Sequence, residues 1–480
     1  VVSDCDAVAD IQRGHHFTQT LAEAAAVSMR RGTDNECADF GQKPADNSDY
    51  QEYIDAVKQG LLSEKDIDVS LKRLFTARFR LGLFDPPAMV KYAQTPDSEI
   101  DSEAHRQLAL KLARESMVLL KNDGILPLSA TTHKITVIGP LAQSSRVLMG
   151  NYNGTPSRST TALDGIRKQF PQSEITFAPG TNFLRQNLLV PGSALSTPDG
   201  KPGLKAEYFT DPNFKGAPAM ARTEPDINYD FAPGTKGKEN IYAVRWTGFL
   251  TPSESGSYQL GLNGSRERLW LDGKVIVDDP NGHSSRPVVS NVTLERGHRY
   301  ALKIEYFQGR ARGVKLVWSR SSSDPAADAV AAAKQADVVI AVVGITSDLE
   351  GEEMDVEVPG FKGGDRTSLD LPKPEEDLLE AVKTTGKPLV VVLMNGSALS
   401  VNWAKENANA ILEAWYSGEE CGAAIAETLA GANNPAGRLP VTFYTGVDQL
   451  PLFEDYSMNN RTYRYFEGQP LYPFGYGLSY

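Results

Sequence analysis

The sequence is poor in cysteine, in basic residues relative to acidic ones, and in long apolar runs. Its three cysteines, Cys5, Cys37 and Cys421, are too few for a disulfide scaffold, and their spacing does not match a zinc site. A formal net charge of −12 disfavours a nucleic-acid or anionic-membrane surface. No apolar run reaches the ~18 residues that a membrane-spanning helix needs. We therefore expect a protein that binds neither nucleic acid nor membranes.

Hydrophobic residues make up 41% of the sequence, which is enough for ordinary protein cores. Its 480 residues predict about three domains. The chain opens on Val1-Val2-Ser3-Asp4, a short β-branched run that ends in a carboxylate. A strand with an acid at its carboxyl end is how parallel α/β enzymes present a catalytic group. Because nothing precedes this strand, we expect the rest of its sheet to lie outside the sequence.

Residues 1–85 read as this strand followed by helices. Helices are predicted at 18–31, 49–59 and 63–82, the last with a Ser63 cap. One strand followed by such helices predicts the C-terminal part of a TIM-like barrel. A proline-rich linker follows at 86–105.

Residues 106–200 and 325–445 alternate helices with wholly apolar strands. This alternation predicts an α/β sandwich domain whose parallel sheet is covered on both faces. The strands are expected at 117–121, 135–138, 338–344, 389–394 and 411–414, and the helices at 103–116, 163–170, 328–335, 375–384 and 422–430.

Residues 201–324 show a different pattern: strands of alternating apolar and polar residues, separated by turns such as Asp272-Gly273. Its strands are expected at 205–209, 242–249, 256–262, 268–271, 275–277, 300–306 and 314–319. This pattern predicts an all-β sandwich inserted into the α/β domain. Residues 446–480 are then a tail that leads to a further domain outside the sequence.

A second acidic feature, Asp348 to Asp355, follows directly on the strand predicted at 338–344. It therefore occupies the carboxyl edge of a parallel sheet, where such folds bind ligands. The loop continues to Gly364-Asp365-Arg366, and a loop this long is functional or disordered.

Carboxylates at two strand tips suggest acid/base or covalent chemistry. Retaining glycoside hydrolysis needs one carboxylate as nucleophile and one as proton donor, about 5–5.5 Å apart. Clustered acids supply the raised pKa that the donor needs. Two alternatives stay open on composition alone: the acidic run also fits a solvated face or a cation site, and Asp4 also fits a helix cap.

A set of motifs extends over nearly the whole chain. They are Val1-Val2-Ser3-Asp4-Cys5-Asp6-Ala7-Val8, Gly14-His15-His16-Phe17-Thr18, Gly32-Thr33-Asp34, Leu81-Gly82-Leu83-Phe84-Asp85, Glu115-Ser116-Met117-Val118-Leu119-Leu120-Lys121-Asn122, Gly437-Arg438-Leu439-Pro440 and Tyr472-Pro473-Phe474-Gly475. Together they resemble glycoside hydrolase family 3, above all its β-xylosidase-like and bacterial β-glucosidase-like branch. The inserted segment, with Trp246-Thr247-Gly248-Phe249 and Leu271-Asp272-Gly273, resembles a protective-antigen-type sandwich.

The resemblance implies roles for particular residues. Asp4 matches the nucleophile. Glu352 matches the acid/base, as the second Glu of Leu349-Glu350-Gly351-Glu352, with Glu353 and then Glu350 as alternatives. The side chains expected to contact the substrate are Cys5, His16, Asp365 and Arg366.

Some of these residues have a structural interpretation too. Cys5 stands where many family β-glucosidases have Trp, so it either changes a subsite wall or forms a bridge to Cys37, which lies in a family-like Asp-x-x-Cys turn. His16 could equally hold its loop through hydrogen bonds. Trp246, Trp270 and Trp318 fit a sandwich core better than a sugar platform.

The function implied is that of a retaining exo-β-glycosidase, a β-glucosidase acting by double displacement on terminal non-reducing β-D-glucosyl residues. Its substrate is a small oligosaccharide or glycoside, and the reaction needs no metal or organic cofactor. The alternatives are a β-xylosidase of the same family and a catalytically incomplete fragment that acts as a carbohydrate-binding module. We expect the missing N-terminal barrel portion as a partner and a periplasmic or secreted location, and a homodimer is left open.

Overall fold

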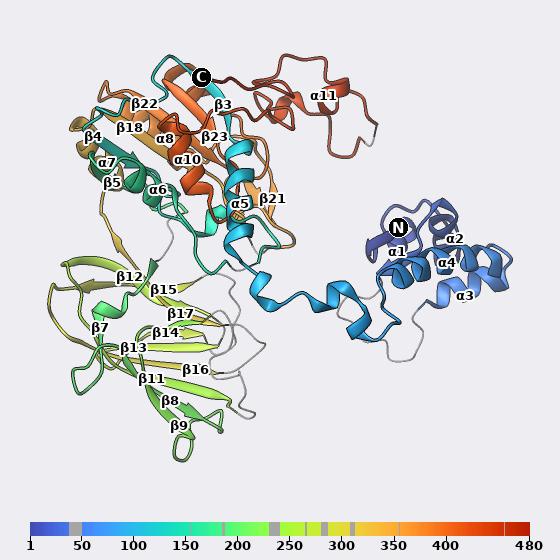
Figure 1. The fold of residues 1–480 in the computed structure, drawn as a ribbon, viewed down its shortest axis with the longest axis horizontal. Coiled ribbons are helices and arrows are strands. Elements are labelled where there is room, and N and C mark those ends of the chain that lie inside the picture. The colour runs from blue at the N-terminus through green and yellow to red at the C-terminus, as the bar shows by residue number, and fades with distance from the viewer. Residues whose placement is uncertain are drawn as a thin grey trace. The chain divides into compact units, whose positions relative to one another are not determined.

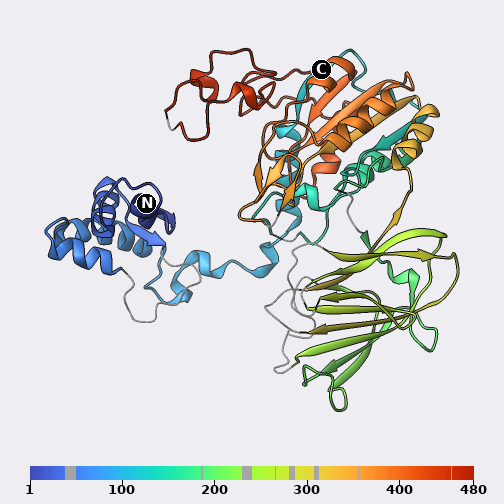
Figure 2. The ribbon, with the colours of Figure 1, turned by 180° about the vertical axis from the view of Figure 1, so that it is seen from behind.

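The computed structural model describes residues 1–37, 50–154, 156–184, 188–229, 241–264, 266–279, 287–307, 313–354, 356–455 and 457–480. These residues form two compact units, Val1–Ile100 and Asp101–Tyr480, and each is described by itself. Figures 1 and 2 show the ribbon from opposite sides. Position 49 of a predicted helix and Asp355 of the acidic run lie outside the described residues.

The first unit contains the N-terminal strand in a short parallel sheet. β1 (Val2–Cys5) pairs with β2 (Asn35–Cys37), and Cys5 lies opposite Cys37. The helices are α1 (Ala7–Arg13), α2 (Leu21–Arg31), α3 (Gln51–Lys58) and α4 (Glu64–Arg80). A small core of Ala22, Ala26, Ala56 and Leu62 packs α2 against α3 and the residues that follow it. α1 was not predicted, because seven residues are too few to show an apolar period.

Capping residues explain where α2 and α4 begin. Thr20 Oγ1 accepts a hydrogen bond from Glu23 N, and the Glu23 carboxylate accepts one from Thr20 N, so α2 begins at Leu21 rather than at the predicted Thr18. Ser63 caps α4 as predicted, and its N–H and hydroxyl both donate to Asp66.

The predicted linker contains short 3₁₀ turns. They are η1 (Pro87–Met89), η2 (Lys91–Gln94) and η3 (Asp97–Glu99). α5 (Glu103–Ser116) then begins the α/β part of the second unit at the residues predicted for it.

The α/β part is built on one sheet with strand order β3-β23-β22-β18-β4-β5. Its strands are β3 (Val118–Asn122), β4 (Lys134–Ile138), β5 (Glu174–Ala178), β18 (Val338–Gly344), β22 (Leu389–Met394) and β23 (Ala410–Glu413). The prediction of a parallel sheet is wrong for β3, which pairs antiparallel with β23. An apolar run carries no signal of strand direction, so the sequence could not show this.

Two apolar clusters cover the two faces of this sheet. Alternate residues of β18 point to opposite sides, so Val339, Ala341 and Val343 belong to one cluster and Val338, Ile340 and Val342 to the other. The helices are α6 (Ala162–Gln169), α7 (Pro325–Lys334), α8 (Lys373–Lys383), α9 (Asn402–Asn407) and α10 (Cys421–Leu429). α7, α8 and α9 contribute to the first cluster, and α5, α6 and α10 to the second, as the predicted two-sided covering requires.

An antiparallel sandwich separates β5 from β18 along the chain. One of its sheets has the order β10-β17-β12-β15, with β6 on β17, and the other has β14-β13-β16-β11-β8-β9, with β7 on β11. The strands are β6 (Leu188–Leu189), β7 (Leu195–Ser196), β8 (Leu204–Phe209), β9 (Met220–Glu224), β10 (Asn228–Tyr229), β11 (Ala243–Leu250), β12 (Gly256–Asn263), β13 (Glu267–Leu271), β14 (Lys274–Asp279), β15 (Val288–Leu294), β16 (Tyr300–Phe307) and β17 (Val314–Ser321). Trp246 is fully buried in its core, whereas Trp270 and Trp318 are half-buried.

The long loop after β18 contains regular structure among its described residues, and the sequence predicted none there. It forms a small antiparallel sheet of β19 (Glu357–Val358), β20 (Phe361–Lys362) and β21 (Asp365–Arg366). Phe361 is buried in the apolar cluster beneath it, which gives the loop a core of its own. The turns η4 (Arg146–Leu148), η5 (Gly192–Ala194) and η6 (Val447–Gln449) and the short helix α11 (Thr462–Tyr465) complete the elements. No helix among the described residues is long and apolar enough to cross a membrane.

Candidate active site

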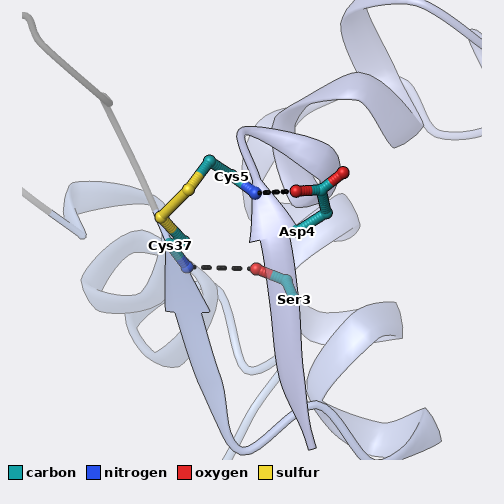
Figure 3. Close-up of a disulfide and its surroundings, with 4 residues drawn as sticks. All are labelled: Ser3, Asp4, Cys5 and Cys37. Carbon is teal, nitrogen blue, oxygen red and sulfur yellow. Dashed lines mark hydrogen bonds between the residues drawn. A yellow bond between two sulfur atoms is a disulfide. The ribbon is translucent and has the colours of Figure 1, made fainter. Parts of the chain in front are cut away.

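Asp4 stands at the carboxyl end of β1 in the first unit. Its side chain is exposed, and Oδ1 accepts a hydrogen bond from Cys5 N at 2.9 Å (Figure 3). Successive side chains of a strand point to opposite faces. Figure 3 shows the Asp4 carboxylate extending away from the disulfide between Cys5 and Cys37. The Asp4 carboxylate is therefore exposed on the side of β1 away from the disulfide.

A disulfide joins Cys5 to Cys37, with their Cα atoms 4.3 Å apart. The bridge that the sequence left open for these two cysteines is therefore formed, and a contact between Cys5 and a sugar stays a prediction. Cys37 N also donates to Ser3 Oγ at 3.0 Å (Figure 3). Asp6 N donates to Cys37 O at 2.8 Å. The backbone on both sides of Asp4 is thus held to β2.

Asp34, in the family-like Gly32-Thr33-Asp34 motif, ties this sheet to a helix. Its Oδ1 accepts a hydrogen bond from Arg73 Nη1 of α4 at 3.0 Å, and its backbone N–H donates to Val1 O at 2.8 Å. The Asp34 side chain is only 6% exposed, so its carboxylate in the ion pair with Arg73 is shielded from water. The hydrogen bond to Val1 O holds the beginning of β1 to this residue.

His16, predicted to contact the substrate, is exposed and follows α1. Its backbone has the left-handed value φ 51°, and its N–H donates to Gln12 O at 3.2 Å. This conformation is uncommon for a residue other than glycine. A contact between His16 and a sugar stays a prediction.

The acidic loop of the second unit begins at the carboxyl end of β18, as predicted. Leu349 is 2% exposed and anchors the loop in the apolar cluster below. Glu350 follows, and its carboxylate accepts hydrogen bonds from Gly396 N at 3.0 Å, Ser397 Oγ at 2.5 Å and Tyr416 OH at 2.9 Å. Both oxygens of Glu350 are therefore engaged by the protein.

Glu352 and Glu353 are exposed in a turn that main-chain bonds close at both ends. Gly351 N donates to Gly364 O at 3.1 Å, and Met354 N donates to Gly363 O at 3.0 Å. Within the described part of the chain, the Glu352 carboxylate has no hydrogen-bond or ion-pair partner. Glu353 is likewise exposed and without a partner among the described residues, so both glutamates of this turn are open to solvent.

Asp365 and Arg366 belong to β21, beside this turn. Asp365 is exposed, whereas Arg366 is half-buried and donates to Ser397 Oγ at 2.8 Å, Ala398 O at 3.0 Å and Ser368 O at 2.9 Å. Arg366 Nη2 is buried without a hydrogen-bond partner among the described residues. Their predicted contacts with a substrate are not tested by these observations.

Two buried carboxyl groups at the same sheet edge were missed by sequence reasoning. Glu413 ends β23 and accepts hydrogen bonds from Asn395 Nδ2 and Trp415 N, both at 3.1 Å, and burial raises its pKa to about 8. Glu375 of α8 accepts one from Gly344 N at 2.6 Å, and burial raises its pKa well above the ordinary value. A charged residue closing an apolar strand was the available signal for Glu413.

The segment after β4 joins the acidic loop. Arg146 Nε donates to Asp348 Oδ1 at 3.1 Å, and Ser347 Oγ donates to Met149 O at 3.3 Å.

Among the predicted site residues, the structure brings Asp4 together with Cys5 in the first unit, and the loop of Glu352 together with Arg366 in the second. Among the described residues, no three His, Cys, Asp or Glu side chains are grouped so as to hold a metal ion.

Comparison with known proteins identifies the family. Residues 117–480 match the model of the glycosyl hydrolase family 3 C-terminal domain, so this chain belongs to glycosyl hydrolase family 3. The predicted family and the predicted α/β class are confirmed.

Named relatives cover the whole chain. It is 36% identical over 494 residues to a xylan 1,4-beta-xylosidase of Xylanibacter ruminicola, an alignment that covers 100% of this chain and 56% of the relative. It is 29% identical to a periplasmic beta-glucosidase of Salmonella typhimurium, covering 100% of this chain and 48% of that protein. The chain thus spans about half the length of the curated relatives it matches.

A solved structure shows the same fold. The crystal structure of a beta-glucosidase from Kluyveromyces marxianus in complex with glucose superposes with a TM-score of 0.69 at 24% identity, covering 95% of this chain and 57% of that one. At this identity the likeness bears on the fold alone.

Proposed function

We propose that the protein is a retaining exo-β-glycosidase, a β-glucosidase that removes terminal non-reducing β-D-glucosyl residues. The observation that supports this most directly is Asp4, an exposed carboxylate on a strand tip braced by a disulfide, in a chain of glycosyl hydrolase family 3. Glu352, an exposed acid of the loop after β18, is the proposed partner.

The proposed reaction has two displacements. An Asp4 oxygen attacks the anomeric carbon, the glycosidic C–O bond breaks, and Glu352 gives its proton to the departing oxygen. In the second step the Glu352 carboxylate takes a proton from water, and the water oxygen displaces Asp4 from the anomeric carbon. Neither step calls for a metal or an organic cofactor.

The remaining parts of the proposal concern binding and location. Cys5, His16, Asp365 and Arg366 contact the bound saccharide, and barrel strands outside this sequence supply further sugar contacts. The protein is periplasmic or secreted, a location supported by the Cys5–Cys37 disulfide and by the relative named as periplasmic. A homodimer remains a prediction.

A β-xylosidase is a second candidate, favoured by two observations. Cys5 stands where many family β-glucosidases have Trp, and it is tied into the disulfide beside Asp4. The relative from Xylanibacter ruminicola is named a xylan 1,4-beta-xylosidase. Rates with nitrophenyl β-D-glucoside and β-D-xyloside decide between them, since a strong xyloside preference contradicts the glucosidase proposal.

Variants of the complete protein that contains this sequence test the chemistry. Asp4→Ala should lower kcat by about 10⁴-fold or more, as removal of a covalent nucleophile does. Asp68→Ala is the matched control, because Asp68 is an exposed aspartate of α4 and should leave the rate unchanged.

Two further measurements complete the test. The first sugar released should have the β configuration by NMR, and release of the α anomer contradicts retention. The 480-residue chain alone should not turn over substrate. If it binds saccharide and the complete protein hydrolyses none, the alternative of a carbohydrate-binding module holds instead.

A further inference from the structure

Glu350 links the acidic loop to the ends of two neighbouring strands. Gly396 and Ser397 follow β22, Tyr416 follows β23, and all three donate hydrogen bonds to the Glu350 carboxylate. We call these four residues the carboxylate clamp. Because β22 and β23 are adjacent in the sheet, the clamp fastens the loop to two paired inner strands.

The donors of the carboxylate clamp are themselves held in place. Tyr416 follows Trp415, whose backbone is left-handed at φ 60° and whose indole Nε1 donates to Ser116 O at 3.1 Å. A Cβ atom at position 396 would lie 2.8 Å from Tyr416 Cε2 and 2.9 Å from Glu350 Oε1, so a larger residue would displace one of these groups. The hydroxyl of Tyr416 stays protonated, since burial raises its pKa far above the ordinary value.

A second connection reaches the other side of the loop. Arg366 donates to Ser397 Oγ, which in turn donates to Glu350, so β21 is tied to the same point as Glu350. The turn of Glu352 is bonded to the residues just before β21 through Gly351 N and Met354 N. The backbone of Glu352 is therefore fixed from both ends, while its side chain has no partner among the described residues.

A general acid is effective only when its proton lies within hydrogen-bond reach of the leaving oxygen. A side chain in a surface turn loses this precision unless the turn is held by supporting hydrogen bonds. We propose that the carboxylate clamp is a positioning device for Glu352, and that Glu350, Ser397 and Tyr416 set the place from which Glu352 donates its proton. This inference rests on the proposed function.

Tyr416→Phe tests it, because the change removes one clamp hydrogen bond and keeps the ring. Aryl glycosides with a poor leaving group, such as phenyl, need protonation of the departing oxygen, whereas dinitrophenyl glycosides do not. In the complete protein, we expect kcat for the phenyl glycoside to fall about tenfold, part of the 10²–10⁴-fold that a general acid contributes. The rate of glycosyl-enzyme formation from the dinitrophenyl glycoside should change less than about threefold.

Tyr476→Phe is the matched control. Tyr476 is a half-buried tyrosine whose hydroxyl donates to Leu120 O at 3.2 Å, outside the clamp. It should leave both rates unchanged. Ser397→Ala removes a second clamp donor and should repeat the leaving-group effect, which keeps the test valid if Tyr416→Phe folds poorly. If both clamp variants lower the two rates equally, or neither rate changes, the positioning role is wrong.

Azide separates this inference from the proposed function. In Glu352→Ala, azide should attack the glycosyl-enzyme, displace Asp4 and restore turnover with a glycosyl azide as product. In Glu350→Ala, azide should not restore turnover, because Glu350 is not the proton donor. Rescue of Glu350→Ala overturns the clamp and makes Glu350 the acid/base. If azide does not restore turnover of Glu352→Ala and the rate of this variant does not depend on the leaving group, Glu352 is not the acid/base. The clamp's proposed role is then wrong as well.

Discussion

At the scale of single residues, the disulfide has a measurable consequence for stability. It closes a loop between positions 32 residues apart, which in the loop-entropy model stabilises the folded chain by about 3–4 kcal/mol. We expect a reductant to lower the thermal unfolding midpoint of the first unit. Thiol titration in denaturant should find one free thiol before reduction, from the buried Cys421, and three afterwards.

Cys421→Ser is the control for this prediction. It removes the thiol that lies outside the disulfide, so the variant should keep the sensitivity to reductant and show no thiol before reduction. Three free thiols in oxidised, denatured protein would contradict the bridge.

A second residue-scale prediction concerns pH and Glu413. Its pKa is about 8 in the folded protein against an ordinary 4.5, because burial disfavours the charged form. Unfolding therefore releases a proton when the pH lies between these two values. The free energy of unfolding falls as the pH rises through that window, by about 1.4 kcal/mol for each pH unit. Glu413→Gln should flatten this fall when denaturant midpoints are measured from pH 5 to 8.

The control for Glu413 is Glu406→Gln, since Glu406 is an exposed residue of α9. Its curve should run parallel to that of the unchanged protein. If the curve of Glu413→Gln is parallel as well, the buried carboxyl does not titrate as its surroundings indicate.

Residue roles were only partly accessible from the sequence. The sequence places Glu350 and Glu352 in one acidic run, but it does not show which of the two carboxylates is hydrogen-bonded by the protein. What separates them is hydrogen bonding to Gly396 and Tyr416, residues 46 and 66 positions away along the chain. Such contacts leave no periodic trace in a sequence.

At the scale of elements, two adjacent glycines give a sharp test of the acidic loop. Gly363 and Gly364 both have left-handed backbones, at φ 65° and 93°, so alanine at either position should cost about 1–2 kcal/mol. Only at Gly364 would a Cβ atom collide with backbone, 2.1 Å from Gly351 O, while the space beside Gly363 is open.

We therefore expect Gly364→Ala, and not Gly363→Ala, to disrupt the turn that carries Glu352. Hydrogen exchange at Gly351 N–H, which donates to Gly364 O, should speed up strongly in Gly364→Ala. Equal protection of this N–H in both variants would show that the loop accommodates the collision.

Elements were predicted best where burial is complete. β18 and β22 have the predicted bounds, because uninterrupted apolar residues mark strands buried on both faces. β9 and β15 were missed; each lies at the edge of its sheet, and neither shows a clear alternation of buried and exposed residues. The small sheet of β19, β20 and β21 was missed because its strands are two residues long.

At the scale of the whole molecule, the two units differ in how much core they contain. The first is held by a core of Ala22, Ala26, Ala56 and Leu62, whereas the second has three extensive apolar clusters. The first unit also exposes Phe79 and Leu83 on and just after α4, at 66% and 63%. Since buried apolar area is the main source of stability, the first unit should unfold more readily.

Limited digestion of the 480-residue chain with a lysine-specific protease tests this difference. Lys58, Lys65, Lys72 and Lys91 are exposed in the first unit, and Lys91 lies in its linker-like end. We expect early cleavage at these sites and a long-lived C-terminal fragment that contains Asp101–Tyr480. Reduction of the disulfide should speed cleavage within the first unit and leave the fragment's lifetime unchanged, because both bridged cysteines lie in that unit. Cleavage at similar rates throughout both units would show that the larger core gives no protection.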